Sequence, residues 1–427
     1  MNNRFDIVIL GLTITSSWGN GHATTFRGLV RGLAAKGYRV LFLERDAEWY
    51  AGNRDTPHPH GATTILYNSF DELVARFEPA VTEAALVMVG SYVPDGIRIG
   101  EWVTSVAKGT CVFYDIDTPV TLARLDAGDW EYITPDLIRK YNAYLSFTGG
   151  PTLRKIESKY GSPMARPLYC AVDPEEHLPA IADMKWDLGY LGTYSADRQA
   201  ALEALLLDPA RRSPGRWFAV AGPQYPDSIE WPPNVERTIH LSPREHPAFY
   251  GSQRFTLNIT REAMKLAGYS PSVRLFEAGA CGAAIVSDWW EGLDSIFKIG
   301  KEVLLAEGTD DMLRILRDAR DVQRLQIAAA ARRRVLAEHT PTVRATQLES
   351  YWKEINDNVS PGAARRNGRD RQIAGGQGTG LASEPNRETA GGEARATAVS
   401  MSNTGHLYEP ARKDAGDSPN DCRAACT

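Results

Sequence analysis

The sequence predicts an α/β fold of two successive halves that face each other across a cleft, followed by a disordered tail. Near-continuous apolar runs, typical of parallel strands covered on both faces, alternate with amphipathic helical patterns. The pattern stops at an acidic, proline-bearing segment and then restarts, so a linker divides it. We therefore expect an N-terminal domain at 1–172, a linker at 173–186, a C-terminal domain at 187–357 and a disordered tail at 358–427.

The first half opens with a β-loop-α-β unit. Phe5–Leu12 is a nearly unbroken apolar run, and apolar residues then recur at helical spacing from Phe26 to Leu33. Gly37 ends that helix, and Arg39–Glu44 reads as the second strand. Further strands are expected at 84–89, 110–114, 144–147 and 168–170.

The second half repeats the alternation after the linker. Strands are expected at 188–191, 217–221, 255–259, 284–287 and 303–305. Two helices, through 327–337 and 345–355, close this half. No internal repeat of 20–50 residues is present, which excludes a solenoid or a propeller.

The composition narrows the function classes. The net charge of −5 disfavours a general nucleic-acid binder, and no apolar run approaches the roughly 20 residues that a bilayer span needs. The N-terminus does not read as a signal peptide. Cys111, Cys170 and Cys281 lie in apolar segments, as in a protein of a reduced, cytoplasmic compartment. Cys422 and Cys426 have no nearby histidine, so we expect no metal there.

The tail prediction depends on composition. From Ser360 onward the chain is rich in Gly, Ala, Arg, Asn, Ser and Thr and has almost no large apolar side chains. Such a segment cannot bury enough apolar surface to offset the entropy lost on ordering. We expect it to be disordered.

The most informative stretch is 268–288, which reads as a loop, a short helix, a glycine turn and a strand. Ser270 and Ser272 lie where the helix begins, with Ser270 as the expected cap. The free N–H groups of that helix end, together with Arg274, suit a diphosphate. The carboxylate of Glu277 suits ribose hydroxyls. An ordinary βαβ unit with a surface arginine and glutamate would give the same pattern.

This stretch, with its run Glu277-Ala-Gly-Ala-Cys-Gly, resembles the nucleotide-sugar site of GT-B-fold glycosyltransferases. The group it resembles most is the spore-maturation CgeB-like group, and the architecture fits over residues 5–357. The resemblance implies transfer of a sugar from a nucleoside diphosphate donor, expected to be UDP-linked, to a hydroxyl acceptor. Retaining relatives carry a glutamate pair whose first member falls here at Tyr269, which leaves the stereochemical outcome open.

The same resemblance assigns further donor contacts. Gly192 opens the second half with a turn into a helix that carries Arg198, a candidate for gripping the pyrophosphate. Arg261 and Lys265 follow another strand end and add positive charge near the same crevice. Each of these cations could also be an ordinary solvated side chain.

The glycine loop after the first strand carries Gly19, Gly21 and His22. A dinucleotide-binding loop would have a third glycine where Thr24 stands, so NAD binding is disfavoured, although Glu44 ends the second strand. The resemblance implies that the glycines let the donor sugar and acceptor approach, and that His22 deprotonates an acceptor hydroxyl. A histidine near a helix N-terminus without chemistry is the alternative.

Asp115 and Asp117 follow the strand 110–114, at the edge where α/β sheets bind ligands. Asp-x-Asp is also the metal motif of the GT-A fold, but the second α/β half argues against that fold. The resemblance makes both residues acceptor-site or base residues; helix capping is the alternative for Asp117, because Pro119 follows it. We expect no metal and no cofactor, since a helix end and arginines can stabilise the departing diphosphate.

Other function classes fit the same pattern. A nucleotide-sugar epimerase or a non-catalytic nucleotide-sugar-binding or assembly protein would share the fold. The pattern also fits a two-domain periplasmic binding protein, which the missing signal sequence disfavours. For a transferase, the expected partners are the nucleotide-sugar donor and an acceptor that is a saccharide, lipid-linked or protein. Nucleic acid is not expected, and peripheral membrane contact stays open.

Overall fold

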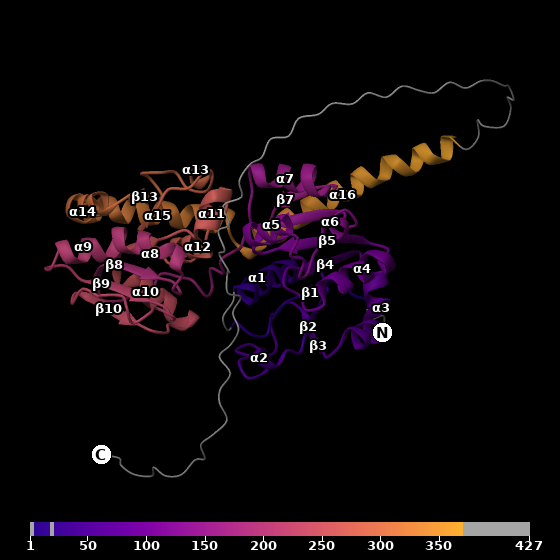
Figure 1. Ribbon diagram of the computed structural model, residues 1–427, viewed down its shortest axis with the longest axis horizontal. Coiled ribbons are helices and arrows are strands. Elements are labelled where there is room, and N and C mark those ends of the chain that lie inside the picture. Colours follow the sequence, from indigo (N-terminus) through magenta and orange to yellow (C-terminus); the bar gives the residue numbers. More distant parts are fainter. Residues whose placement is uncertain (1–3, 18–20, 370–427) are drawn as a thin grey trace, which may run out of the picture. The chain divides into compact units, whose positions relative to one another are not determined.

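The computed structural model describes the backbone of residues 4–17 and 21–369, and side chains as far as residue 358 (Figure 1). The two α/β halves expected from the sequence are both present. Each has its own parallel sheet with helices packed around it. The tail predicted from residue 358 onward lies outside the described residues, apart from the last turns of the final helix.

The first half holds a seven-stranded sheet within the described residues, in the order β3-β2-β1-β4-β5-β6-β7. All of its neighbouring strands pair in parallel. The central strands are fully buried, as their continuous apolar sequences predict. The strands are β1 (Ile7–Gly11), β2 (Val40–Arg45), β3 (Thr63–Tyr67), β4 (Leu86–Gly90), β5 (Thr110–Asp115), β6 (Ala143–Ser146) and β7 (Ala165–Pro167).

Helices connect these strands and cover the sheet. They are α1 (His22–Ala35), α2 (Glu48–Ala51), α3 (Phe70–Glu83), α4 (Gly96–Val106), α5 (Thr118–Ala127), α6 (Pro135–Ile138) and α7 (Pro151–Tyr160). Two clusters of buried apolar side chains occupy the two faces of the sheet.

The second half repeats the same topology in a six-stranded parallel sheet of described residues, ordered β10-β9-β8-β11-β12-β13. The strands are β8 (Trp186–Leu191), β9 (Phe218–Ala221), β10 (Val235–Thr238), β11 (Gln253–Asn258), β12 (Ile285–Ser287) and β13 (Leu304–Leu305). In both sheets the first strand in sequence therefore lies beside the fourth. The strand order reverses between these two strands.

The second half has shorter helices. They are α8 (Ala196–Leu202), the π-helix η1 (Glu203–Leu207), α9 (Asp208–Arg212), the 3-10 helix η2 (Pro243–Glu245), α10 (His246–Gly251), α11 (Glu262–Ala267), α12 (Val273–Ala280), α13 (Leu293–Ile296), α14 (Thr309–Asp318) and α15 (Asp321–Glu338).

The last described helix, α16 (Pro341–Arg369), returns to the first half. Leu348 and Ile355 are buried in the same apolar cluster as Phe26 and Leu29 of α1. Trp352 Nε1 donates to the hydroxyl of Thr110 at 3.1 Å. Figure 1 shows this helix, in orange, among the purple elements of the first half. The two halves are therefore joined by α16 as well as by the linker.

The structure differs from the sequence-based expectation mainly at the sheet edges. The edge strands β3 and β10 were not expected, because neither has a continuous apolar run; β3 is largely half-exposed. β7 lies at Ala165–Pro167 and not at 168–170. An edge strand has only one neighbour and less burial, so its sequence carries a weaker signal.

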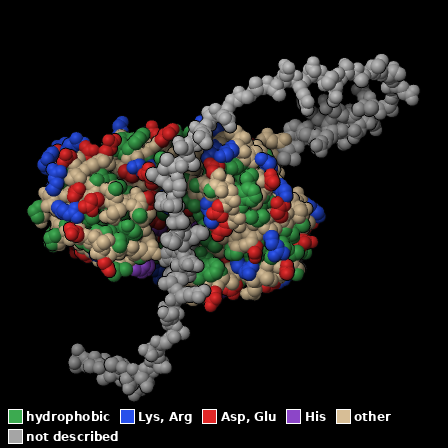
Figure 2. Space-filling model, in the orientation of Figure 1, with side chains coloured by type: hydrophobic (Ala, Val, Ile, Leu, Met, Phe, Trp, Pro, Cys, Tyr) green, Lys and Arg blue, Asp and Glu red, His purple; other side chains and the backbone are tan. Residues whose placement is uncertain are grey.

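The three cysteines expected to lie in the core, Cys111, Cys170 and Cys281, are buried and free. Among the described helices, none is long and apolar enough to cross a bilayer. On the surface shown in Figure 2, basic and acidic side chains are interspersed, so no field of a single sign covers this face.

Candidate functional site

Each sheet has one point where the strand order reverses, and open α/β sheets bind ligands at the carboxyl ends of the strands beside that point. In the first sheet this point lies between β1 and β4, and in the second between β8 and β11. His22 and Tyr92 come from the segments that follow β1 and β4. Gly192 and Arg261 come from those that follow β8 and β11. Most of the predicted site residues therefore surround these two points.

Two guanidinium groups of the second half lie together without a carboxylate partner. Neither Arg198 nor Arg274 forms an ion pair with any described carboxylate; their hydrogen bonds go to neutral oxygens. Burial lowers the pKa of Arg198, and the positive charge of Arg274 lowers it further. The like charges of these two partly buried guanidinium groups repel each other, and the charge of Asp197 offsets only part of this effect on Arg198, so this place is electrostatically suited to an anion.

Arg274 is held in place by the ends of the two central strands. Its Nε donates to the carbonyl of Leu191, and its Nη1 donates to Asn258 Oδ1 at 3.2 Å. Gly192 makes room for it, because a Cβ there would lie 2.8 Å from Arg274 Nη2. The predicted glycine thus permits the arginine to cross the switch point of the sheet.

Arg198 lines a hollow with aromatic walls. Tyr190, Tyr194 and Tyr225 contribute to it, and the hydroxyl of Tyr225 donates to the carbonyl of Gly192 at 3.0 Å. Arg198 itself donates to the carbonyl of Thr193 at 2.6 Å, while its Nε is buried without a hydrogen-bond partner among the described residues. An unpaired buried donor is costly unless a ligand satisfies it.

Helix α12 begins beside this pair of arginines. Its N-cap is Ser272, whose hydroxyl accepts from the Arg274 N–H at 3.3 Å. The expectation that Ser270 is the cap is wrong: Ser270 is buried, and its hydroxyl bonds that of Thr148 in the first half at 3.0 Å. Ser270 therefore joins the two halves, while Ser272 shapes the helix end.

The two other predicted cations already have partners. Lys265 Nζ lies 3.5 Å from the buried carboxylate of Asp288. Arg261 lies 3.9 Å from Asp117, a residue of the first half. Their charges are therefore partly balanced within the protein, unlike those of Arg198 and Arg274.

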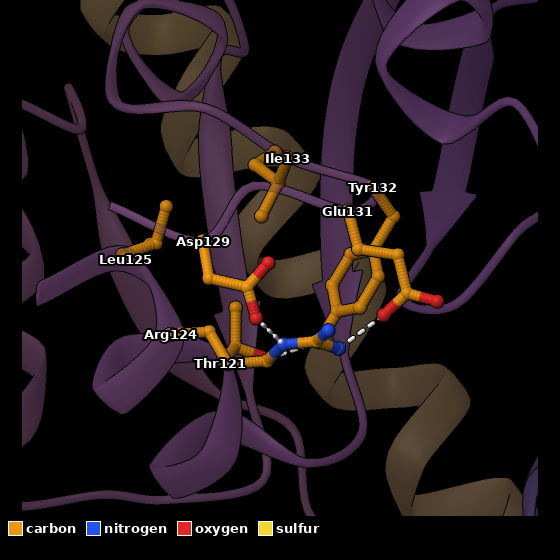
Figure 3. Close-up of a pocket in the computed structure, with 7 residues that line it drawn as sticks. All are labelled: Thr121, Arg124, Leu125, Asp129, Glu131, Tyr132 and Ile133. Atoms are coloured by element: carbon orange, nitrogen blue, oxygen red, sulfur yellow. Dashed lines mark hydrogen bonds and ion pairs between the residues drawn. The ribbon is translucent and has the colours of Figure 1, made fainter. Parts of the chain in front are cut away.

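A hollow in the first half also contains an arginine, but its surroundings differ from those of Arg198 (Figure 3). It is lined by Thr121, Arg124, Leu125, Asp129, Glu131, Tyr132 and Ile133. Arg124 lies between two carboxylates, donating to Asp129 at 2.8 Å and also to Glu131. Those carboxylates raise the pKa of Arg124 and balance its charge. This hollow offers no spare positive charge for an anionic ligand.

Glu277 lies on α12 with its carboxylate largely enclosed. Its side chain is 12% exposed, and the hydroxyl of Tyr250 donates to Oε2 over a long 3.5 Å. His177 and His246 each approach it to 3.8 Å. Among the described residues no Lys or Arg forms an ion pair with it, so its lone pairs remain available to hydroxyl or cationic ligands.

His22 is the first residue of α1 and is 7% exposed. Its ring meets that of Tyr92 edge-on, with ring centres 5.6 Å apart. Burial lowers the pKa of His22 to about 4, so the imidazole is neutral near pH 7. Gly21 precedes it with open space at its Cα, and Gly19 lies outside the described residues.

Asp117 occupies the N-cap position of α5, but its side chain does not cap the helix. It instead accepts from the hydroxyl of Tyr92 at 3.2 Å and faces Arg261. Burial raises the pKa of Asp117. The Asp117 carboxylate is thus directed toward the second half.

Asp115 has a different position. It is fully buried and accepts hydrogen bonds from Thr121 Oγ1 at 2.8 Å, from the hydroxyl of Tyr144 and from the backbone N–H of Asp117 at 3.2 Å. Burial raises its pKa to about 6. Asp115 therefore organises the loop that carries Asp117 and does not face the solvent.

Glu44 shows why a dinucleotide interpretation does not suit this chain. It is fully buried, and both oxygens accept hydrogen bonds from residues 13–15, including the Ile14 N–H at 2.7 Å and the Thr15 N–H at 3.0 Å. A ribose-binding carboxylate would need free lone pairs. Glu44 instead fixes the loop after β1.

Sequence reasoning missed several residues that shape the site. Tyr92, two residues after β4, has a positive φ of 60°. Asn258 at the end of β11 holds Arg274, and Tyr190 lies under the Arg274 guanidinium, 5.0 Å from it. All three lie at or next to a strand end at a switch point. The sequence indicates that these residues lie near strand ends. It does not give the order of the strands, which is what places these strand ends at a switch point.

Comparison with known proteins agrees with this architecture. Residues 198–350 match the family model described as glycosyl transferase-like, which covers less than half of the chain. No protein with a curated description matches the sequence.

Several solved structures are similar along most of the chain. Sucrose-phosphate synthase from Thermosynechococcus elongatus has a TM-score of 0.59 at 13% identity, covering 83% of this chain and 100% of that one. HepE of Anabaena, solved with UDP and glucose, gives 0.56 at 12% identity, with 82% and 100% covered. An alpha-glucosyltransferase solved with UDP-glucose and DNA containing an abasic site gives 0.61 at 11% identity, with 82% and 100% covered. The chain therefore has the GT-B fold, with two parallel-sheet Rossmann-like domains.

Proposed function

We propose that this protein is a glycosyltransferase that moves a sugar from a nucleoside diphosphate donor to a hydroxyl acceptor. The observation that carries the proposal is that two partly buried arginines, Arg198 and Arg274, lie at the switch point of the second sheet and form no ion pair with a described carboxylate. A protein tolerates two such charges where a bound anion balances them. The N-terminus of α12 adds backbone N–H groups beside them.

The donor is proposed to be a UDP-sugar. Support comes from the family match over residues 198–350 and from the structural neighbours solved with UDP or UDP-glucose. In this arrangement Arg198 and Arg274 hold the diphosphate, and Glu277 accepts hydrogen bonds from ribose hydroxyls. The arginines and the helix end stabilise the negative charge that develops on the leaving diphosphate as the glycosidic bond breaks.

The acceptor is proposed to bind on the side of the first half, near His22, Tyr92 and Asp117. Asp117 and Arg261 bring the two halves to within 3.9 Å of each other at this place. His22 is neutral near pH 7, and a neutral imidazole can accept the proton of an attacking hydroxyl.

The pH dependence of turnover tests the role of His22. Because burial lowers its pKa to about 4, we expect kcat/KM to stay level from pH 8 down to about pH 5 and to fall near pH 4. An unburied histidine would lose activity near its usual pKa of about 6.5. The profile should be measured where circular dichroism shows an intact fold, because the unfolded chain takes up this proton below about pH 6.5 and stability then declines.

A fall centred near pH 6 would contradict this assignment. It would point to Asp115, whose pKa is raised to about 6, or to the network that it supports. The variant His22→Gln separates titration of His22 from titration of Asp115. It should remove a fall of kcat/KM near pH 4 and leave a fall near pH 6 unchanged.

Calorimetric titration with UDP, and turnover measured as UDP release, test the function itself. UDP at 100 times its Kd should stabilise the fold by about 2.7 kcal/mol. We further propose that catalysis requires no metal, so EDTA should leave UDP release largely intact. Failure of UDP and other nucleoside diphosphates to bind would overturn the donor assignment. Activity lost on chelation and restored by Mn²⁺ would overturn the metal-independent mechanism.

A further inference from the structure

Three side chains from separate segments converge beside the proposed donor site. His177 comes from the segment between the two halves, His246 begins α10, and Glu277 lies on α12. His177 Nε2 lies 3.8 Å from Glu277 Oε1, and His246 Nδ1 lies 3.8 Å from Glu277 Oε2. The three possible ligand atoms all lie within 4.8 Å of one another.

The polar atoms of this cluster are not satisfied by the surrounding protein. His177 is 4% exposed, and neither of its ring nitrogens has a hydrogen-bond partner among the described residues. The same is true of His246 Nδ1, which points at the carboxylate. Buried imidazole nitrogens without partners are rare, because each loses its hydration without compensation. Here they surround a carboxylate that lacks a Lys or Arg partner among the described side chains.

The chemistry of the three groups fits a divalent transition-metal ion. Two imidazoles and one carboxylate are a ligand set that suits Zn²⁺, with further positions left for water. Zn²⁺ takes such ligands at about 2.0–2.2 Å, which places neighbouring ligand atoms roughly 3–4 Å apart. The two contacts of 3.8 Å, one to each oxygen of the carboxylate, lie near the upper end of that span, and all three ligand atoms lie within 4.8 Å of one another.

The state of the ligands also suits a metal. The His246 side chain is 15% exposed, and its Nδ1 lies 3.8 Å from the Glu277 carboxylate. A hydrogen bond with the backbone of Leu241 acts on the same ring and orients it, as such outer contacts do for metal-binding histidines.

We propose that His177, His246 and Glu277 form a binding site for a divalent transition-metal ion such as Zn²⁺, and that the bound ion excludes the nucleotide. The exclusion rests on the proposed function, because it requires Glu277 to be the carboxylate that meets the ribose. The ion occupies the lone pairs that the ribose hydroxyls need. The bound ion therefore inhibits donor binding and takes no part in the sugar transfer itself.

Cobalt binding to the full-length protein tests the metal site without any nucleotide. Co²⁺ should bind with a visible d–d spectrum that lacks sulfur-to-metal charge transfer, which separates this site from Cys422 and Cys426 in the tail. His177→Ala should remove one equivalent of this Co²⁺. The control His240→Ala changes an exposed histidine of the same half and should bind Co²⁺ as the wild type does. Equal spectra for wild type and His177→Ala, with the fold intact by circular dichroism, would overturn the site.

Calorimetric UDP binding with and without Zn²⁺ tests the exclusion. At free Zn²⁺ of about ten times its own Kd, competition should raise the apparent Kd for UDP about tenfold, and EDTA should reverse the effect. In His177→Ala the Kd for UDP should not respond to Zn²⁺. Co²⁺ binding without any effect on UDP would overturn the exclusion, while absent UDP binding in metal-free protein would count against the proposed function and leave the metal site standing.

Discussion

Replacing Arg198 with methionine should weaken UDP binding by about 10- to 100-fold while leaving the free energy of unfolding unchanged or slightly higher. The loss of affinity corresponds to about 1.5–3 kcal/mol for hydrogen bonds to a charged group. Stability should not fall, because the substitution removes a buried charge that Arg274 repels. The one hydrogen bond that is lost, to the carbonyl of Thr193, is worth only about 1 kcal/mol.

Calorimetric titration with UDP and urea denaturation measure the two quantities separately. Arg212→Met is the matched control, since Arg212 is an exposed arginine that pairs with Asp310. This control should leave both the Kd for UDP and the unfolding midpoint near the wild-type values. If Arg198→Met instead loses stability and keeps its affinity for UDP, Arg198 is a structural residue and the donor site lies elsewhere.

The second large effect concerns the contact between α1 and α16. At Gly32 a Cβ would lie 2.3 Å from the backbone carbonyl oxygen of Pro341. Because backbone cannot rotate out of the way, Gly32→Ala must push the two helices apart. We expect a loss of about 1–3 kcal/mol in the free energy of unfolding, the usual cost of overpacking.

Gly28→Ala, one turn earlier in α1, is a closely matched control. Its Cβ would meet Pro341 Cγ at 3.6 Å, an ordinary contact distance. Alanine is also the better helix former by up to about 1 kcal/mol, so this variant should be as stable as the wild type or more stable. Urea denaturation of both variants measures the free energy of unfolding and shows whether the added methyl group at Gly32 is destabilising. Equal stability would show that the close helix contact does not contribute to holding the first half together.

Much of the fold was predictable because burial on both faces leaves a signature in the sequence. The central strands β1, β4 and β5 are buried at every position and read as apolar runs. The edge strands β3 and β10 escaped prediction for the complementary reason, since one exposed side removes that signature. The sequence also indicated the loop and helix at 268–280, where serines, a proline and glycines set the backbone.

The candidate site was predictable in its residue types but not in their partners. Four cations look alike in the sequence: Arg198, Arg261 and Lys265, which come in the segments after strand ends, and Arg274, which lies in α12. Only the structure shows that Lys265 lies 3.5 Å from Asp288, while Arg198 and Arg274 form no ion pair with a described carboxylate. Likewise, Asp115 and Asp117 are two positions apart, yet one is buried in its own domain and the other faces Arg261.

By itself, the sequence determined where the central strands and the main helices form and which polar residues follow them, because these depend on local spacing and burial. Tertiary structure alone decided which charges are balanced, and it brought His177 to within 3.8 Å of Glu277, a residue a hundred positions away. The physical reason is that electrostatic and metal-ligand interactions depend on distance through space. That distance is set by strand order and helix packing, which no local pattern in the chain specifies.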